Sequence, residues 1–375
     1  MTRFNRFPGF LMVLTAMIGT RGAHADWVRT NSGLADSNIT PLVLSESVLY
    51  AGGYKGIAKS LDSGATWTDI KPTAGGSIIV SSIVALAVGE GRMFAGIQGS
   101  GLIRSTDSGK TWNRAPTVPA GSNVAALILD GGRVLVGTGT GFYVSTDTGA
   151  TFAASNTGLT SLNISALLQD SSDLYAGTLD SGVFVSGDNG GTWTALGATG
   201  FYSRKIVALA KNGGSLFAAT KSGAALYVTT NKGALWTIVG SATLAGNHAV
   251  SSLAVKDGRM YAGTGGNGVY YSLNNGVTWT AANEGLTFQT ISCLLPVGSS
   301  LLASTTEDGG TFGQGIFKRP LSEMASGPTG VRRVMHGLKV QQGMGPRNGS
   351  EALDASGRRI PDVRKTSSLK VFRKG

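Results

Sequence analysis

Short apolar segments separated by glycine and small polar residues recur along most of this chain of 375 residues. One unit opens with an apolar run such as Val84–Val88 and continues with a second run that ends in small residues, such as Arg92–Gly96. A third run starts at glycine, as in Gly182–Ser186, and a fourth follows a threonine and an aromatic residue. The runs have the length and turn spacing of strands, and no segment has the pattern of a long amphipathic helix. Each unit is therefore predicted to be four short strands.

The second run of the unit is the clearest marker of the repeat. It occurs seven times, at residues 48–52, 92–96, 134–137, 174–177, 216–219, 259–263 and 301–304. Four strands in roughly 40 residues are typical of a propeller blade. A β-solenoid fits less well, because its coils usually repeat at shorter periods and lack hairpin turns. We therefore predict an all-β, seven-bladed β-propeller over residues 26–319.

An eight-residue motif joins the third and fourth strands of six units, and Ser105–Trp112 is its clearest copy. Its acidic or amide position recurs at intervals of 40 to 45 residues, as Asp62, Asp107, Asp147, Asp188, Asn231 and Asn274. Such side chains accept hydrogen bonds from nearby backbone N–H groups, and the glycine that follows supplies a positive φ. An amide cannot act as a general acid or base and is a poor ligand for a cation. We interpret all six residues as structural braces and predict no metal site.

The seventh unit ends at Pro320 without this motif. Its missing strand is predicted at the other end of the chain, because Asp26–Leu34 resembles the fourth strand and exit loop of unit six, Trp279–Leu286. An N-terminal strand at residues 27–30 that completes the last blade would close the ring and cover two sheet edges.

The first 25 residues have the pattern of an export signal. Arg3 and Arg6 precede the apolar run Phe10–Ile18, and Ala23–Ala25 forms an A-x-A cleavage site. A transmembrane anchor is the weaker alternative, because the apolar run is shorter than the roughly 20 residues that a bilayer requires. We expect the mature chain to start at Asp26, to carry no transmembrane helix, and to reside in the periplasm, at the cell surface or outside the cell.

The charge lies mainly at the two ends of the chain. The net charge is +11, but residues 1–25 carry +3 and residues 320–375 carry +7, which leaves +1 for residues 26–319. Binding of nucleic acid by the body is not expected, because the charge that would neutralise phosphates is absent. The single cysteine, Cys293, lies in an apolar run and is predicted to be a buried thiol.

The motif S-x-D-x-G-x-T-W resembles the Asp-box, or BNR, repeat of sialidases, sortilin-type receptors, xyloglucanase-type glycoside hydrolases and photosystem II assembly factors. The resemblance covers residues 27–319 and is specific for the blade, not for an activity. It implies that ligands bind on the face opposite the boxes, formed by the loops between the second and third strands and by the exit loops.

The sialidase arginine trio and its tyrosine–glutamate pair are not recognisable in this sequence, and neither HExxH nor GxSxG occurs. Xyloglucanase-type enzymes pair two propellers, and this chain has one. If the protein is an enzyme, the candidate carboxylates are Asp180, Glu307 and Asp308, with solvated loop acids as the alternative. The candidate ligand-binding residues are Tyr54, Lys55, Phe201, Tyr202, Arg204, Lys221 and His248.

Residues 320–375 form a basic tail. Ala352–Ile360 and the final Leu369–Gly375 resemble the ends of type IX secretion sorting domains, and a disordered tail is the alternative. For the whole protein we predict a monomeric, exported propeller without a cofactor that binds a glycan or a protein without catalysis. A glycoside hydrolase or lyase, and an assembly factor for an envelope complex, are the alternatives.

Overall fold

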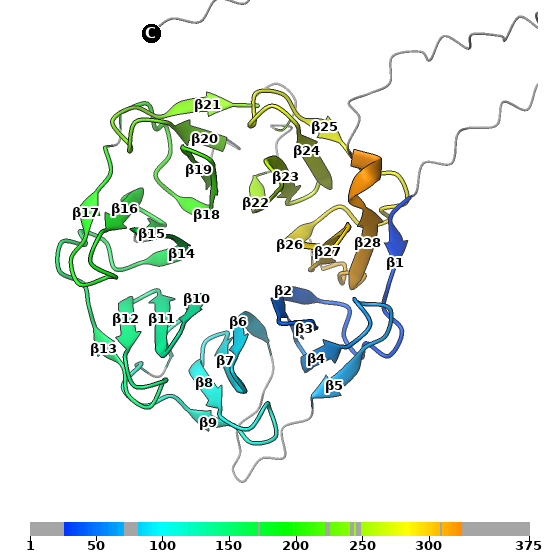
Figure 1. Cartoon of the computed structure of the whole chain (residues 1–375), viewed down its shortest axis with the longest axis horizontal. Helices are drawn as coiled ribbons and strands as arrows, with labels where there is room; N and C mark the ends of the chain where they lie inside the picture. The colour runs from blue at the N-terminus through cyan, green and yellow to red at the C-terminus, as the bar shows by residue number, and fades with distance from the viewer. Residues whose placement is uncertain are drawn as a thin grey trace, which may run out of the picture. The chain divides into compact units, whose positions relative to one another are not determined.

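The computed structural model describes residues 26–70, 82–119, 121–171, 173–197, 199–221, 226–240, 244, 249–307 and 310–324. These residues form seven four-stranded antiparallel sheets arranged as a ring (Figure 1). The predicted all-β, seven-bladed propeller is confirmed. The chain divides into two compact units, residues 1–328 and 329–375, of which the second lies outside the described residues, as does the predicted sorting segment.

Each of blades 1 to 6 consists of four strands that are consecutive in the chain. Blade 1 contains β2 (Ile39–Ser45), β3 (Val48–Gly53), β4 (Gly56–Ser60) and β5 (Thr68–Ile70); blade 2 contains β6 (Ile83–Gly89), β7 (Arg92–Ile97), β8 (Gly101–Ser105) and β9 (Asn113–Arg114). Blade 3 contains β10 (Val124–Asp130), β11 (Arg133–Thr138), β12 (Gly141–Ser145) and β13 (Ala153–Ala154); blade 4 contains β14 (Ile164–Asp170), β15 (Asp173–Thr178), β16 (Val183–Ser186) and β17 (Thr194–Ala195). Blade 5 contains β18 (Ile206–Asn212), β19 (Ser215–Thr220), β20 (Leu226–Thr229) and β21 (Thr237–Val239); blade 6 contains β22 (Val250–Lys256), β23 (Arg259–Thr264), β24 (Val269–Ser272) and β25 (Thr280–Ala281).

Blade 7 is built from both ends of the ring. Its strands are β26 (Ile291–Val297), β27 (Ser300–Thr305), β28 (Ile316–Pro320) and β1 (Val28–Arg29), followed in the chain by a short 3₁₀ helix, η1 (Leu321–Met324). β1 pairs antiparallel with β28, with Val28 opposite Lys318. The indole of the preceding residue, Trp27, is 3% exposed, and its backbone N–H donates to the Glu284 carbonyl at 2.8 Å.

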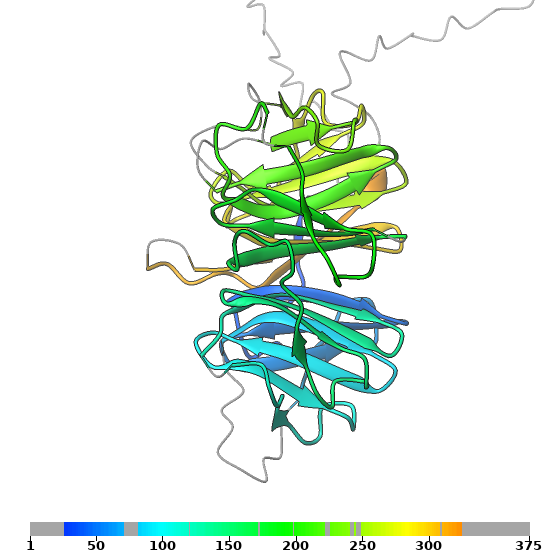
Figure 2. The same cartoon turned by 90° about the vertical axis from the view of Figure 1, so that its left-hand side faces the viewer.

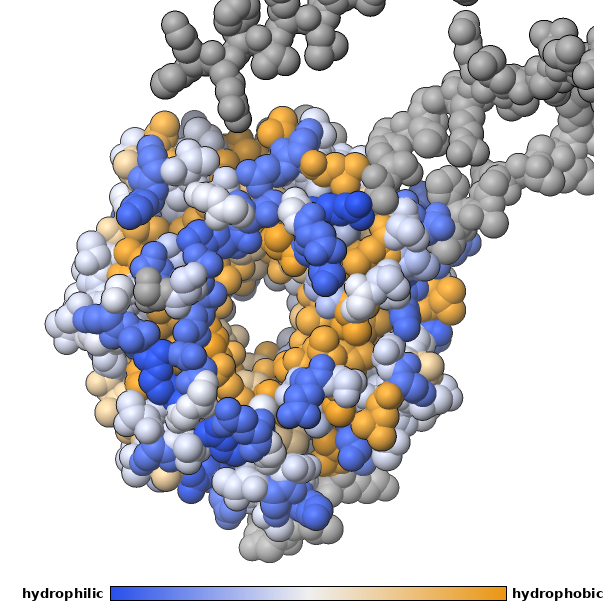
Figure 3. Space-filling model, viewed as in Figure 1, coloured by the Kyte–Doolittle hydropathy of each residue, from blue (hydrophilic) through white to orange (hydrophobic). Residues whose placement is uncertain are grey.

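The ring has two faces that differ in the turns they carry. The first strand of each blade surrounds the central opening, which Figure 3 shows with apolar residues on its wall. Because the strands alternate in direction, the turns between first and second strands lie on the same face as the Asp boxes, and we call this the box face. Hydrogen bonds join the two kinds of turn, as from Ser108 N to Gly91 O at 3.0 Å. The loops between second and third strands and the exit loops form the opposite face, the loop face; Figure 2 shows the β27–β28 loop projecting from the ring.

Glycine near the end of the second strand allows neighbouring blades to pack closely. A Cβ on Gly177 would lie 2.6 Å from Cγ2 of Ile206, which begins the next blade. The same approach occurs at Gly52, Gly96, Gly137 and Gly263. Blade 5 has Ala219 at this position, and the following blade begins with the smaller Val250 in the same apolar cluster. The recurring A-G of the sequence therefore sets the spacing between blades.

The four aspartate boxes share one set of hydrogen bonds, which blade 2 illustrates. The Asp107 carboxylate accepts the Ser105 hydroxyl at 2.7 Å, and from Thr111 it accepts the backbone N–H at 2.8 Å and the hydroxyl at 2.6 Å. The Ser105 oxygen accepts from Gly109 N at 2.9 Å. These bonds hold the pKa of Asp107 at about 2, with the Thr111 hydroxyl as the largest cause. The box carboxylates are therefore ionised hydrogen-bond acceptors and not proton donors at neutral pH.

The two asparagine boxes keep the brace with altered donors. Asn274 Oδ1 accepts from Thr278 N at 2.9 Å, and its amide nitrogen donates to the Thr278 hydroxyl at 2.9 Å. Asn231 Oδ1 accepts from Leu235 N at 3.0 Å, and leucine supplies no hydroxyl at that position. The turn thus forms around either a carboxylate or an amide.

Candidate functional site

The described candidate residues all lie in loops of the loop face. Tyr54 and Lys55 form the β3–β4 turn, while Phe201, Tyr202 and Arg204 lie in the exit loop between β17 and β18. Asp180, Lys221 and Glu307 lie in the β15–β16, β19–β20 and β27–β28 loops. His248 and Asp308 are outside the described residues.

One group of candidates meets at the junction of blades 4 and 5. The Arg204 carbonyl accepts from Gly182 N at 3.1 Å, which ties the exit loop to the β15–β16 loop. The Lys205 carbonyl accepts from Lys221 N at 2.8 Å, which ties the same exit loop to blade 5. Arg204, Lys205 and Lys221 are all exposed, and Tyr202 beside them is 89% exposed. The fold therefore brings the loop segments that carry three cations and one exposed aromatic residue to the same blade junction.

A second group lies on blades 7 and 1. Tyr54 is 38% exposed and Phe312, in the β27–β28 loop, is 65% exposed. Asn38 connects the two blades, because its buried side chain accepts from Gly313 N at 2.6 Å. The first and second groups are on opposite sides of the central opening, as the positions of β17 and β28 in Figure 1 show.

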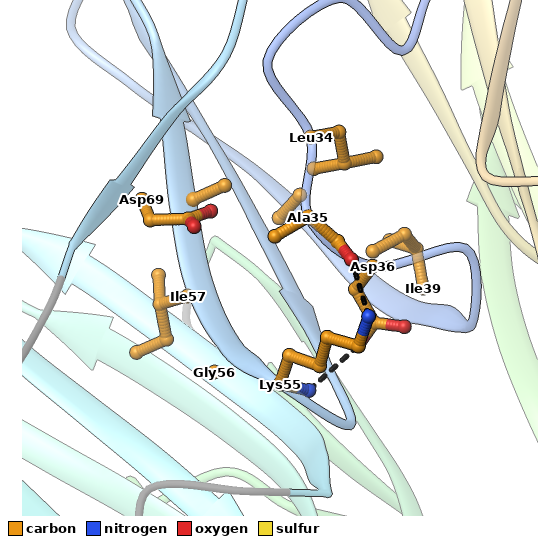
Figure 4. Close-up of a pocket in the computed structure, with 10 residues that line it drawn as sticks. Leu34, Ala35, Asp36, Ile39, Lys55, Gly56, Ile57 and Asp69 are labelled. Carbon is orange, nitrogen blue, oxygen red and sulfur yellow. Dashed lines mark hydrogen bonds between the residues drawn. The ribbon is translucent and has the colours of Figure 1, made fainter.

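Two of the candidate side chains are occupied by contacts within the protein. The ring of Phe201 packs against Tyr227 and Trp236 with centroid distances of 4.7 and 4.5 Å. Lys55 Nζ donates to the Ala35 carbonyl at 2.8 Å, and Lys55 N donates to Asp36 Oδ2 at 2.7 Å (Figure 4). Both residues therefore support the loops around them, and their role toward a ligand remains a prediction.

The loop face has a small crevice beside Lys55. It encloses about 210 Å³, including its open mouth, and its walls include Leu34, Ile57 and Asp69 (Figure 4). A larger crevice of about 440 Å³ lies on the box face between blades 1 and 2, lined by Glu46, Tyr50 and Glu90 among others. Neither crevice contains one of the candidate carboxylates.

The candidate carboxylates Asp180 and Glu307 belong to blades on opposite sides of the opening (Figure 1). Both are exposed. Glycosidase carboxylates stand about 5 to 10 Å apart, on either side of the scissile bond. The fold therefore does not bring Asp180 and Glu307 together from adjacent blades. Glu307 with Asp308 remains a prediction, since Asp308 is outside the described residues.

Potential metal ligands and the single thiol were also located in the described part of the chain. No group of three or more His, Cys, Asp or Glu side chains there could hold a metal ion. Burial raises the pKa of the Cys293 thiol, which favours its protonated form.

Sequence reasoning missed two features of the loop face. The sequence placed Phe312 and Lys205 in loops of this face, but neither was among the residues predicted to bind a ligand. Sequence reasoning also missed an asparagine clamp: Asn31, Asn156 and Asn283 each accept from the N–H of a residue in the third strand, at 2.8 Å. The recurring N-x-G-L of the exit loops, as in Asn31–Leu34 and Asn283–Leu286, was the available signal for this clamp.

Residues 198–314 match a family model described as the DUF6242 beta propeller domain. Among curated proteins, none matches the chain in sequence. No helix in the described part of the chain is both long and apolar enough to cross a bilayer.

Several solved structures share the fold. The extracellular domain of the one component system BT4673 from B. thetaiotaomicron superposes with a TM-score of 0.64 at 14% identity, covering 79% of this chain and 40% of that one. The GH74 xyloglucanase from Xanthomonas campestris superposes with a TM-score of 0.61 at 18% identity, covering 80% of this chain and 54% of that one. YCF48 from Cyanidioschyzon merolae superposes with a TM-score of 0.58 at 16% identity, covering 79% of this chain and 98% of that one. YCF48 bound to D1 peptide superposes with a TM-score of 0.58 at 14% identity, covering 81% of this chain and 97% of that one.

This chain thus spans about two fifths of the length of the BT4673 domain. At these identities the likeness concerns the fold. The propeller fold that the Asp-box resemblance implies is confirmed at that level.

Proposed function

We propose that this protein is an exported, non-catalytic propeller that binds a glycan or a protein through its loop face. One observation carries the proposal: each of the exposed large aromatic residues in the described part of the chain, Tyr54, Tyr202 and Phe312, belongs to the loop face. Exposed aromatic rings are costly to solvate and supply much of the binding energy at recognition surfaces. On the box face, the large hydrophobic side chains that are exposed in the described part of the chain are leucine and valine.

The fold neighbours are compatible with either ligand class. One is named for a glycan substrate and another carries a bound peptide. Export is supported by the signal pattern of residues 1–25 and by the extracellular location of the BT4673 domain. An assembly-factor role would be one form of protein binding by the same face.

The binding test compares two sets of apolar truncations in the purified protein. The loop-face variant Tyr54→Ala/Tyr202→Ala/Phe312→Ala is expected to lose at least tenfold in affinity for ligands found on glycan and peptide arrays, since each aromatic anchor contributes about 1 kcal/mol or more. The box-face control Leu61→Ala/Val277→Ala truncates side chains that are 74% and 66% exposed and should bind like the wild type. Equal losses in both variants would refute the assignment of binding to the loop face.

The alternative of a glycoside hydrolase or lyase is tested with plant and bacterial polysaccharides as substrates. We expect no product from the wild-type protein. Turnover that Glu307→Gln or Asp180→Asn abolishes, while binding persists, would refute the non-catalytic assignment.

A further inference from the structure

The exit loop between blades 4 and 5 presents Tyr202 on a rigid base. The adjacent Phe201 ring is fixed between Tyr227 and Trp236, which are each 1% exposed. The buried Tyr227 hydroxyl accepts from Tyr202 N at 3.1 Å, and Trp236 N donates to Thr199 O at 2.9 Å. The loop is therefore held at three successive points, and the 89% exposure of Tyr202 arises from a fixed backbone.

Glycine at position 200 is required for this arrangement. Its φ is +93°, and a Cβ there would lie 2.0 Å from the Trp236 carbonyl oxygen. A residue that is fixed before a ligand arrives loses little conformational entropy on binding. The loop thus pre-organises a large exposed ring, which is the arrangement found in rigid aromatic anchors of binding sites.

Three cations lie on the loops at this blade junction and lack charged partners. Arg204, Lys205 and Lys221 are exposed, and none of the ion pairs within the described residues involves them. A backbone bond from Gly182 ties the Arg204 segment to the β15–β16 loop, and one from Lys221 ties the Lys205 segment to the β19–β20 loop. Asp180 is the only acidic residue in the loop-face segments of blades 3, 4 and 5. The local charge is therefore positive on a ring whose body is close to neutral.

We propose that Tyr202, Arg204, Lys205 and Lys221 form a subsite for an anionic polysaccharide, namely a chain of uronic acid residues. This inference rests on the proposed function and specifies its ligand. The apolar face of a sugar ring stacks on Tyr202, and the carboxylates of that sugar and its neighbours pair with the three cations. The Arg204 guanidinium donates hydrogen bonds to the sugar hydroxyls, and the Tyr202 hydroxyl can donate or accept them.

A polysaccharide fits this surface better than a peptide. Peptides commonly bind by adding a strand to a sheet edge or by laying a helix in an apolar groove. Within the described residues, the site is made of turns and contains no strand edge. A polymer that repeats one planar apolar face and one carboxylate per unit needs only a ring and spaced cations.

The test measures binding of polygalacturonate and alginate to the full mature chain, with highly methyl-esterified pectin as the counterpart lacking charge and poly-L-glutamate as an acidic peptide. We expect the polyuronates to bind at least tenfold more tightly than either comparison polymer. Affinity should fall as NaCl rises, because salt screens exposed charges. Failure of both polyuronates to bind at millimolar sugar would overturn the proposal, as would poly-L-glutamate binding equally well.

Matched variants locate the site. Lys205→Gln/Lys221→Gln is expected to weaken polyuronate binding about tenfold, since two exposed ion pairs are lost. Lys110→Gln/Lys232→Gln removes the same charge from the box face and should change the affinity less than twofold. Tyr202→Ala should weaken binding about tenfold, whereas Tyr202→Phe, which keeps the stacking ring, should retain most of it.

The outcomes separate this proposal from the proposed function. If Tyr54→Ala and Phe312→Ala impair an array ligand while the Lys205/Lys221 variant does not, the loop face binds a ligand but the anionic subsite is wrong. If loop-face changes affect no ligand at all, both proposals fail. Equal effects of the two lysine pairs would mean nonspecific charge attraction and would also overturn the subsite.

Discussion

The two faces of the ring differ in how far their turns and loops repeat from blade to blade. On the box face, six turns repeat one hydrogen-bond pattern, with the same serine or threonine, the same Asp or Asn and the same glycine. On the loop face, the loops differ in length and chemistry, from the short β3–β4 turn to the extended β27–β28 loop. The repeated positions are those that the backbone requires, whereas the varied positions carry the exposed aromatic rings and the unpaired cations.

Blade 7 sharpens this contrast because it lacks a box. Where other blades place serine or threonine at the end of the third strand, this blade has Arg319, which is 3% exposed and donates to Glu284 at 2.8 Å. Arg319 faces Leu301 in the same register in which Ser60 faces Leu49. An ion pair to the neighbouring exit loop thus occupies the place of the serine hydroxyl. The comparison predicts that changes on the box side and rim alter stability, and that changes on the loop face alter binding.

The largest effect on stability is expected at the rim, for Trp27→Ala. Removing a buried indole that joins β1 to blade 6 should lower the free energy of unfolding by about 3 to 5 kcal/mol. Tyr202→Ala removes an aromatic ring of similar size from the loop face and should change stability by less than about 0.5 kcal/mol. Urea unfolding measures both. If Trp27→Ala lowered the free energy of unfolding no more than Tyr202→Ala does, the contrast between rim and loop face would be wrong.

A smaller loss of stability is expected for Gly137→Ala, which adds a methyl group where two blades pack closely. The added Cβ would lie 2.7 Å from Cγ2 of Ile164, so the blades must move apart, at a cost of about 1 to 3 kcal/mol. Gly187→Ala is the matched control, because nothing lies within 4 Å of its Cβ position. Thermal unfolding of the two variants should differ clearly. Equal melting temperatures would show that the glycine does not set the spacing.

The box serine is expected to contribute about 1 to 2 kcal/mol to the free energy of unfolding. Ser145→Ala leaves the buried Gly149 N–H without its acceptor at 2.8 Å and removes a donor from Asp147. Ser203→Ala, on the loop face, removes a hydroxyl with only a long 3.4 Å bond from Lys205 N and should be neutral. Urea midpoints compare the two. If Ser145→Ala left the urea midpoint unchanged, the interpretation of the box as a structural brace would be wrong.

The smallest effect is a dependence on pH that only the carboxylate boxes produce. Hydrogen bonds from the box threonine and serine hold the pKa of Asp107 and Asp188 at about 2 and lower that of Asp62 and Asp147 as well. Because these values are lower in the folded state, the stabilisation is complete above pH 4, the ordinary value, and is lost as pH falls toward 2.

The corresponding variant replaces all four box aspartates with asparagine, as blades 5 and 6 already do. Its urea midpoint should change less between pH 5 and pH 2.5 than that of the wild type. Asp180→Asn is the control and should retain the wild-type dependence. If the fourfold variant kept the pH dependence of the wild type, the box aspartates would not be the source of the acid sensitivity.

The period of the repeat was sufficient to predict the fold, because each strand and turn uses residues whose local preferences agree with the blade. It also predicted that Asn274 could replace an aspartate in its turn. The candidate site was predicted only as a set of loops. Whether Phe201 stands free or packs on Trp236, and whether Lys55 is available or bonded to Ala35, depends on contacts between segments that no local pattern encodes.

The pairing of β1 with β28 also orders the events of synthesis. Val28 leaves the ribosome about 290 residues before its partner Lys318 does. The first strand of the ring therefore waits for the last one, and a chain interrupted at any earlier point carries two open sheet edges that chaperones and proteases recognise. Only a chain that extends through β28 can therefore cover both edges.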